Sequence, residues 1–562
     1  MGHNEADDAP QREGPGRLGR RELIKGAAAA GAAAGLSRTG GHEALARQDS
    51  TPGAAPSGAL QLGGESEPAG TWLPYRASGG AETQVFDLIF SRLIRFDADY
   101  TLIPDLAERF EINDDASEFT FYLRQNVTWH DGTPFTARDV IFTYRMAMQE
   151  GVGASQYNKL SQIQGAAAYR AGEADDVTGL QMIDDYTVKI VLERPNIAFL
   201  VGAAHNNSLV WILPEHILGD ADPATLDQHE FAQNPTVGTG PFRFVEYVPD
   251  QYVKTEANLD YFLGAPKLAE VYVVMAAPAT QLASLESGEL HIMQAISAAD
   301  AERLADSQVV DIVPTPGVGI FQTAIMNERF PDKRMRQALM YGVDRATLMD
   351  VVLQGQGRLV HQSVIGPEWA NYDDLNTYAY NPDMARQLLE EAGWDSSRSI
   401  ELIWEQGFQA IELAAPVFQQ QMSEIGVNVT LTPMDEAAFE KRVIEDMDFD
   451  LAWFGGGAYG LDPDVSSTYY ACANWTPNGG NTTHYCNEEL DELFAQGRAT
   501  SDIDERREIY HQVAKILNED VPTIFWWSEN MIWGISKQVQ GVVPGPNTDI
   551  HWNIHEWSLT EG

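Results

Sequence analysis

The sequence predicts a mixed α/β protein with more than one domain. Phe119, Phe121 and Leu123 alternate with more polar residues, as in a strand that buries one face. The turn dipeptide Asp131-Gly132 follows, and a segment with helical spacing begins soon after it. Roughly 490 residues remain beyond the N-terminal segments described below, which is too many for one core of typical size and enough for two or three domains.

The first 46 residues have the features of an export signal. Arg20 and Arg21 open a twin-arginine pattern, and the Ala- and Gly-rich run over 26–36 is apolar but too short to span a bilayer. Ala44-Leu45-Ala46 supplies the small residues that a signal peptidase requires. Residues 1–46 are therefore predicted to be a twin-arginine signal peptide.

The expected location is the periplasm or the outside of the cell. The first cysteine is Cys472, so none follows the signal to carry a lipid, and a lipoprotein is not expected. No later apolar run approaches the roughly 18 residues of a membrane helix. Residues 47–70, rich in Ser, Pro, Gly and Ala, contain too few apolar groups to fold and are expected to form a disordered leader.

The charge balance excludes some classes of partner. The chain has 82 acidic and 37 basic residues and a formal net charge of −45. Residues 1–46 hold six of each sign, so the whole net charge belongs to the mature part. Such a surface would repel nucleic acid and an anionic bilayer, whereas neutral or cationic ligands are compatible with it. We therefore expect no nucleic-acid partner.

A helix is predicted to start after Thr136, which sits at an N-cap position three residues before Asp139. Val140, Ile141 and Tyr144 give this helix an apolar face. Strand, turn and capped helix over residues 117–140 together resemble a long, ungapped signature of the family 5 extracellular solute-binding proteins. Members of this family are receptors of ABC importers for peptides, nickel and some oligosaccharides.

Further segments resemble the same family in the same order, from about residue 72 to about residue 545. The resemblance implies a two-lobed periplasmic binding protein-like fold (class II, cluster C) with mixed sheets, a hinge and three structural domains. The implied boundaries are domain I over 71–91, 229–326 and 534–562, domain II over 92–228, and domain III over 327–533.

The resemblance also implies a ligand site on an interlobe strand that starts at Asp450. Three successive glycines, Gly455, Gly456 and Gly457, leave backbone groups unshielded, so an extended ligand could pair with them as an added strand. Peptide binders of the family usually carry an aspartate just beyond this point. Here the corresponding position is occupied by Tyr459, which has no charge.

Several other residues are candidates for the same site. Asp462 or Glu405 could replace the missing aspartate, or Tyr459 could stack with Trp404 and Trp453 on sugar rings or a flat ligand. Core packing of the two tryptophans and a turn at Asp462 are the structural alternatives. The resemblance adds Phe321 from domain I and three residues of a first interlobe loop, Tyr75, Arg76 and Ser78.

The two cysteines, Cys472 and Cys486, lie fourteen residues apart around a loop rich in Gly and Asn. An even cysteine count in an exported protein favours a disulfide, and two free thiols are the alternative. With only His484 nearby, the pair makes a poor zinc site. No metal site is expected.

The sequence contains none of the common catalytic motifs for which we searched. Gly-x-Ser-x-Gly, His-Glu-x-x-His, a Walker A loop and a Rossmann fingerprint do not occur. His551 and His555, four residues apart near the chain end, are more typical of a surface than of a metal site. We therefore expect neither an enzyme nor a cofactor.

The functional hypothesis is a monomeric receptor of an ABC importer that captures a peptide between two lobes and delivers it to a membrane permease. The first alternative is a receptor for an oligosaccharide or another small organic solute. A secreted hydrolase and a signalling receptor on the same fold are alternatives of other classes.

Overall fold

The computed structural model describes residues 55–560, with the exception of 65–67, 69–70, 77–80, 100, 153–156, 158–159, 205–210, 363–365, 455–461, 478 and 546–549. The predicted signal peptide, the three interlobe glycines, Tyr459 and Ser78 lie outside the described residues.

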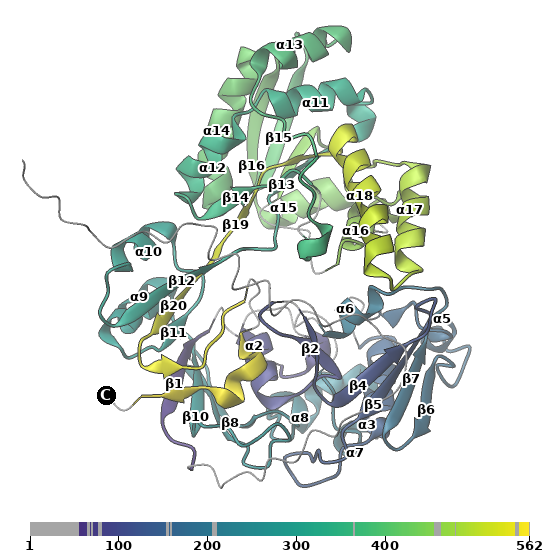
Figure 1. Cartoon of the computed structure of the whole chain (residues 1–562), viewed down its shortest axis with the longest axis vertical. Coiled ribbons are helices and arrows are strands. Elements are labelled where there is room, and N and C mark those ends of the chain that lie inside the picture. Colours follow the sequence, from purple (N-terminus) through teal and green to yellow (C-terminus); the bar gives the residue numbers. More distant parts are fainter. Residues whose placement is uncertain are drawn as a thin grey trace, which may run out of the picture. The chain divides into compact units, whose positions relative to one another are not determined.

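A seven-stranded mixed sheet organises the first part of the fold (Figure 1). Its central strand β1 pairs in parallel with β10 and β11, whereas the β8–β9–β10 side and the pairs of β20 are antiparallel. The strands in sheet order are β12 (Val310–Thr315), β20 (Met531–Ser536), β11 (Ile292–Met293), β1 (Ala59–Gly63), β10 (Glu270–Val274), β9 (Tyr252–Ala257) and β8 (Phe242–Val248).

A four-stranded antiparallel sheet shares a continuous hydrophobic core with the seven-stranded sheet. Its strands in order are β4 (Ala107–Ile112), β5 (Glu118–Leu123), β7 (Thr187–Val191) and β6 (Leu180–Asp184). The helices that accompany these two sheets are α2 (Ala81–Ile89), α3 (Ala137–Met148), α5 (Ala166–Arg170), α6 (Phe199–Ala204), α7 (Glu215–Leu218), α8 (Glu230–Gln233), α9 (Pro278–Ser287) and α10 (Ala298–Leu304).

The predicted strand and capped helix are confirmed in this region. Residues of β5 alternate between buried and half-buried, with Phe119, Phe121 and Leu123 inside. The side chain of Thr136 caps α3, and its backbone N–H donates to the Asp139 carboxylate at 2.9 Å. The sequence therefore fixes both elements locally.

A five-stranded mixed sheet forms a second hydrophobic core. Its order is β16 (Asn428–Met434), β15 (Ser399–Glu405), β17 (Leu451–Phe454), β13 (Gln322–Ile325) and β18 (Thr523–Phe525). The helices of this part are α11 (Lys333–Tyr341), α12 (Arg345–Leu353), α13 (Pro382–Glu391), α14 (Gln409–Glu424), α15 (Glu436–Glu440), α16 (Val465–Tyr470), α17 (Glu488–Arg498) and α18 (Ile503–Asp520).

We call residues 55–315 and 531–560 the first lobe and residues 322–525 the second lobe. Two cores on separate sheets, joined by two chain crossings, confirm the predicted two-lobed α/β fold. Three two-stranded ribbons complete it: β2 (Ile94–Phe96) with β3 (Leu102–Pro104), β14 (Gly357–Leu359) with β19 (Trp527–Glu529), and β21 (Val539–Gln540) with β22 (Ser558–Leu559).

The change of sheet does not coincide with the expected domain boundaries. Strand β13, expected in domain I, belongs to the five-stranded sheet of the second lobe. The expected boundary at 533/534 falls inside β20, which pairs along its whole length with β12. Backbone pairing therefore places both crossings a few residues before the expected positions.

The expected disordered leader is wrong for part of its length, because β1 lies within residues 47–70. Leu60 and Leu62 are buried, and every residue of the strand pairs with β10. Composition suggested disorder because only two large apolar residues occur here, but parallel pairing at the centre of a sheet supplies the missing contacts.

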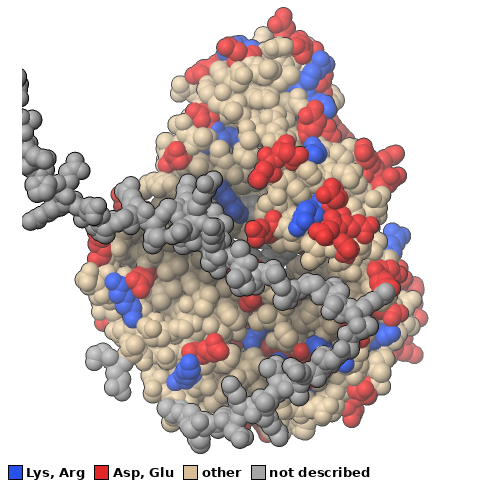
Figure 2. All heavy atoms as spheres, in the orientation of Figure 1, with Lys and Arg blue, Asp and Glu red and all other residues tan. Residues whose placement is uncertain are grey.

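Among the described residues, no helix is both long and apolar enough to cross a bilayer. Asp and Glu side chains outnumber Lys and Arg across the face that Figure 2 shows, in keeping with the strongly negative net charge.

Replacement of Leu62 by Ala tests the role of β1. Leu62 is 1% exposed and pairs with both Val273 and Ile292. We expect Leu62→Ala to lower the free energy of unfolding by about 2 to 5 kcal/mol, because it removes buried methyl groups and leaves a cavity. Urea denaturation followed by circular dichroism measures this change.

The control is Val245→Ala on β8 of the same sheet, where the side chain is exposed. We expect that variant to change stability by no more than about 0.5 kcal/mol. Equal effects of the two substitutions would show that β1 does not form part of the core.

Candidate ligand-binding site

The two lobes are joined by two chain segments that run side by side. The backbone N–H of Phe321 donates to Trp527 O at 2.9 Å, and the N–H of Trp526 donates to Phe321 O at 3.1 Å. The Ser528 hydroxyl donates to Gly317 O at 2.9 Å. Paired segments between two packed cores are the expected place for a hinge.

A glycine is required where the crossings meet. A Cβ on Gly317 would collide with the backbone carbonyl of Glu529. Strand β14 pairs with β19 on the other side of this crossing, with Gly357 opposite Glu529 and Arg358 opposite Ser528. Three backbone segments therefore lie against one another at the junction of the lobes.

Strand β17 runs toward this junction, since Leu451 at its start pairs with Ile325 and Phe454 at its end pairs with Gln322, next to Phe321. The glycine segment follows β17 in the chain. Trp453 on β17 is paired with Trp404 on β15, and both side chains are buried in the second core. The Trp453 ring stacks on Trp526 with ring centroids 4.2 Å apart. The structure thus places both tryptophans in core packing, and neither indole N–H has a hydrogen-bond partner among the described residues.

Two candidates of the crossing region lie nearer to the surface. Phe321 is half-buried, with its ring 6.0 Å from that of Trp527. Glu405 ends β15 and is also half-buried. Phe321 precedes Gln322, which pairs with Phe454 at the end of β17, and Glu405 follows Trp404, which pairs with Trp453 on the same strand.

The three candidates of the first interlobe loop, Tyr75, Arg76 and Ser78, are described to different extents. Tyr75 is buried, and its hydroxyl donates to Thr143 O at 3.0 Å, so burial raises the pKa of the phenol. Arg76 ends a short 3-10 turn, Pro74–Arg76, of which the backbone is described. The Tyr75 ring is therefore part of the first core.

The Asp462 carboxylate is already neutralised. It accepts two hydrogen bonds from Arg506, from Nη1 at 2.9 Å and from Nη2 at 2.7 Å, and both side chains are buried. A bidentate arginine pair of this kind is strong and geometrically specific. Asp462 therefore has no free charge for the amino group of a ligand in this arrangement.

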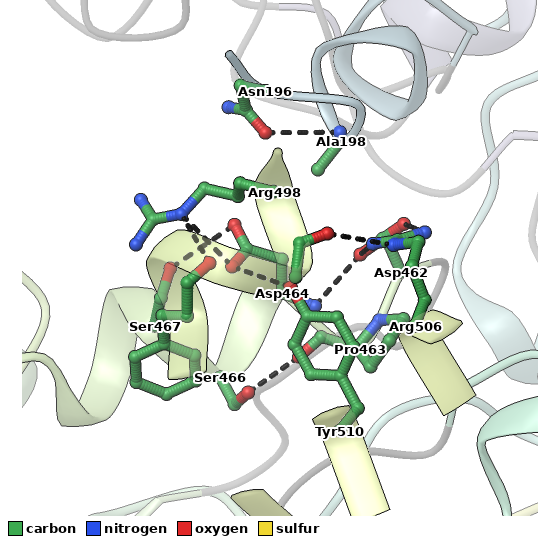
Figure 3. A network of polar contacts seen from close by, with 12 residues as sticks. Asn196, Ala198, Asp462, Pro463, Asp464, Ser466, Ser467, Arg498, Arg506 and Tyr510 are labelled. Carbon is green, nitrogen blue, oxygen red and sulfur yellow. Dashed lines mark hydrogen bonds and ion pairs between the residues drawn. The ribbon is translucent and has the colours of Figure 1, made fainter. Parts of the chain in front are cut away.

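A second buried carboxylate, Asp464, lies in the same network (Figure 3). It accepts a hydrogen bond from the Tyr510 hydroxyl at 3.0 Å and lies 3.4 Å from Nε of Arg498. Burial raises the pKa of Asp464 to about 7, although the positive charge of Arg498 opposes the shift. Sequence reasoning missed this network, because Arg498 and Tyr510 lie more than thirty residues further along the chain.

Sequence reasoning also missed Glu529 at the crossing. Its side chain is exposed and has no hydrogen-bond or ion-pair partner among the described residues, yet burial raises the pKa of its carboxyl group. No sequence motif marks this position.

A hollow of about 560 Å³ lies elsewhere, along the outer side of α3 in the first lobe. Its two arginines are already paired, Arg138 with Glu215 at 3.3 Å and Arg145 with Asp176 at 3.4 Å. It therefore offers no unpaired positive charge.

The cysteines are bonded in the structure, with Sγ of Cys472 and Sγ of Cys486 2.10 Å apart. The bond closes the loop that follows α16 and lies next to the start of α17. Among the described residues, no group of three or more His, Cys, Asp or Glu side chains is arranged to hold a metal ion.

The model of the bacterial extracellular solute-binding proteins, family 5, matches residues 101–477. The chain belongs to this family. It is 29% identical to the oligopeptide-binding protein AppA of Bacillus subtilis over 506 residues, which cover 86% of this chain and 88% of that protein. It is 27% identical to the dipeptide-binding protein of Escherichia coli over 478 residues, which cover 82% of this chain and 87% of that protein.

Solved structures agree with this assignment of the solute-binding protein. The B. subtilis AppA complex with a nonapeptide superposes with a TM-score of 0.71 at 26% identity, covering 90% of this chain and all of that one. The A. tumefaciens R10 protein AgaA, in complex with agropinic acid, gives a TM-score of 0.72 at 25% identity, covering 90% of this chain and 99% of that one.

Replacement of Asp464 by Asn tests the buried carboxylate. Its pKa of about 7 in the folded state lies above the ordinary value of 3.8, so its contribution to stability is complete below pH 4 and is lost as the pH rises through 7. We expect the free energy of unfolding of Asp464→Asn to gain about 3 kcal/mol relative to the unaltered protein between pH 5 and pH 8.

Denaturation curves of both proteins across this pH range measure the difference. Asp504→Asn, at an exposed position at the start of α18, is the control and should show no such trend. A pH-independent difference between Asp464→Asn and the unaltered protein would contradict the raised pKa.

Proposed function

We propose that this solute-binding protein is the extracytoplasmic receptor of an ABC importer and that it captures a peptide between its two lobes. The family assignment over residues 101–477 is the observation that carries the proposal. Relatives named for oligopeptide and dipeptide binding, which align over most of both chains, support a peptide as ligand. A structure of a relative with a bound nonapeptide supports an extended ligand.

The proposed site is centred on the glycine segment that follows β17. Gly455, Gly456 and Gly457 would present unshielded backbone groups to the ligand main chain. Tyr459, Phe321 and Glu405 would line the same site, with Arg76 and Ser78 on the opposite lobe. Four other candidates would not contact the ligand directly, because their side chains are buried or already paired. They are Tyr75, Trp404, Trp453 and Asp462, and their role would be to hold the surrounding structure in place.

We propose Glu529 as the carboxylate that receives a cationic group of the ligand. A tyrosine stands where peptide binders of the family carry an aspartate, and Asp462 is neutralised by Arg506. The Glu529 side chain has no hydrogen-bond or ion-pair partner among the residues that the structure describes, and an approaching cation would offset its lost hydration.

The remaining features of the proposal concern the cellular context. Export by the twin-arginine route, absence of a lipid anchor, a monomeric state and delivery of the ligand to a membrane permease all follow from the sequence hypothesis. The expected domain segments are 71–91, 92–228, 229–326, 327–533 and 534–562. We would move the boundaries at 326/327 and 533/534 a few residues toward the N-terminus, to the two chain crossings between the lobes.

A small organic solute is the second candidate ligand. AgaA, which is similar in fold at 25% identity, holds agropinic acid. The uncharged Tyr459 also removes one feature that favours peptides. Mass spectrometry of material that co-purifies with the exported protein separates the two candidates, because a peptide series and a single small organic compound give different spectra.

Substitution of Gly456 by Val tests the backbone site. A branched side chain at this position should block the approach of a ligand main chain, so we expect peptide affinity to fall at least tenfold with little change in the unfolding temperature. Isothermal titration calorimetry measures the affinity, either with the peptide found by mass spectrometry or with a library of dipeptides to nonapeptides.

Ala437→Val is the matched control, since it adds similar bulk at an exposed position of α15. An unchanged affinity of Gly456→Val would show that the ligand binds elsewhere. Weakened binding in both variants would point to a general effect on folding.

Substitution of Glu529 by Gln tests recognition of the ligand amino group. We expect the affinity for a peptide with a free amino terminus to fall about tenfold, because a desolvated charge pair is lost. The N-acetylated peptide should bind the unaltered protein and Glu529→Gln equally. Glu405→Gln is measured with the same two peptides for comparison. If Glu529→Gln still binds the free peptide more tightly than the acetylated one, Glu529 does not receive the amino group.

A further inference from the structure

A direct backbone hydrogen bond joins the two lobes at a place other than the crossings. The N–H of Ile197, just before α6 in the first lobe, donates to the carbonyl oxygen of Arg498 in the second lobe at 3.0 Å. In Figure 1 the crossing strand β19 lies on the left, whereas α6 and the lower ends of α17 and α18 lie on the right. The bond therefore bridges the lobes on the side away from the hinge.

The donor of this bond is held by Asn196. The Asn196 side-chain oxygen accepts from the Ala198 N–H at 3.1 Å, and its amide nitrogen donates to the Gln162 side chain at 2.7 Å. The backbone N–H of Asn196 donates to Ala116 O at 2.9 Å. The turn that presents the Ile197 N–H is thus closed by one internal bond and fixed to the rest of the first lobe at two points, Gln162 and Ala116.

The acceptor is a carbonyl at the end of a helix. Arg498 is the last residue of α17, so its carbonyl oxygen has no partner within the helix. The Arg498 side chain donates through Nε to Phe494 O at 3.1 Å and lies 3.4 Å from Asp464 Oδ1. Asp464 in turn belongs to the buried network shown in Figure 3.

The network lies next to the proposed ligand segment in the chain. Asp462 and Asp464 directly follow residues 455–461, and their partners Arg506 and Arg498 come from α18 and α17. The end of α17 is thereby tied to the segment that, under the proposed function, lies against the ligand.

We infer that the Ile197–Arg498 hydrogen bond is the closing contact of the ligand cleft, and that Asn196 and Asp464 are positioning residues for it. This inference builds on the proposed function. When the lobes open, the Ile197 N–H and the Arg498 carbonyl form hydrogen bonds to water. When the lobes close, both groups give up their water and form a hydrogen bond to each other. One net hydrogen bond of this kind shifts the ratio of closed to open molecules about threefold to tenfold. The apparent affinity for any ligand that needs the closed form changes by the same factor.

Ile197→Pro removes the donor without removing the turn. Proline lacks the N–H and is favoured at the second position of a β-turn. Ile197 has this position in the turn that the Phe199 N–H closes by donating to Asn196 O at 3.2 Å. Ile197→Ala is the matched control, because it shortens the side chain and keeps the N–H. Both are compared in ligand-free protein labelled at cysteines introduced at the exposed positions Met182 and Leu413, one on each lobe.

The two cysteines carry spin labels, and pulsed electron–electron double resonance measures the distribution of distances between them. The populations of closed and open molecules follow from that distribution. We expect Ile197→Pro to lower the closed-to-open ratio threefold to tenfold at an unchanged unfolding temperature, and Ile197→Ala to retain the ratio. Equal ratios in Ile197→Pro and Ile197→Ala would overturn the inference.

Asp464→Asn carries the same test if Ile197→Pro does not fold. At pH 8 or above, where the Asp464 carboxylate is charged, loss of the charge that holds Arg498 should shift the ratio in the same direction. An unchanged ratio at that pH would overturn the inference. Because these measurements need no ligand, they stand apart from the proposed function. Failure of the unaltered protein to bind any peptide would reject the peptide proposal and leave the closing contact to be judged by the label distances alone.

Discussion

The pairing of the two crossing segments is the constraint on which the other features depend. Phe321 exchanges backbone hydrogen bonds with Trp526 and Trp527, and Gly317 allows the second segment to approach without a clash. Two hydrogen-bonded strands can bend together but cannot slide apart, so motion of the lobes is restricted to rotation about this ribbon. Phe321 belongs to this ribbon, and Phe454 at the end of β17 pairs with the neighbouring Gln322. Glu529, whose side chain has no partner among the described residues, follows Ser528 in the second segment. A solute held there is therefore held at the axis of the motion that would enclose it.

A second contact joins the signature segment 117–140 to two glycines about 100 residues further along the chain. The ring of His130 accepts from the Gly238 N–H at Nδ1 and lies 3.0 Å from the Gly240 carbonyl through Nε2. This requires a neutral ring that donates from Nε2, and burial lowers the pKa of His130 to about 4, which maintains that state at neutral pH. Any side chain at Gly238 or Gly240 would collide with the end of α2. His130 thus holds the segment 238–240, which precedes β8, close against the end of α2.

The features that could be predicted from the sequence are those that depend on residues close together in the chain. Alternation over β5 and the Thr136 cap were predicted because burial pattern and capping act over a few residues. Strand β1 was missed because it contains only Leu60 and Leu62 as large apolar residues and gains its stability from parallel partners more than 200 residues away. The pairing of Asp462 with Arg506 was beyond prediction for the same reason, since no local pattern links residues 44 positions apart. The family resemblance gave the site segment, but it could not tell which side chains are already engaged.

The distribution of charge near the site limits how a solute can be recognised. Asp462 is neutralised by Arg506, and Asp464 has a pKa near neutrality beside Arg498, so neither adds a full free negative charge to the segment that they follow. Position 459 is a tyrosine, and Gly455, Gly456 and Gly457 precede it, separated from it by Ala458. A site on this strand would offer main-chain hydrogen bonds and aromatic faces to a solute. Two charged residues lie at the crossings, Glu529 and Arg358, and the Arg358 guanidinium donates to Gly317 O at 3.3 Å. Main-chain pairing is indifferent to ligand side chains, so such a site favours a class of extended solutes over one particular compound. Selectivity would then be set by which solutes allow the lobes to meet at Ile197 and Arg498.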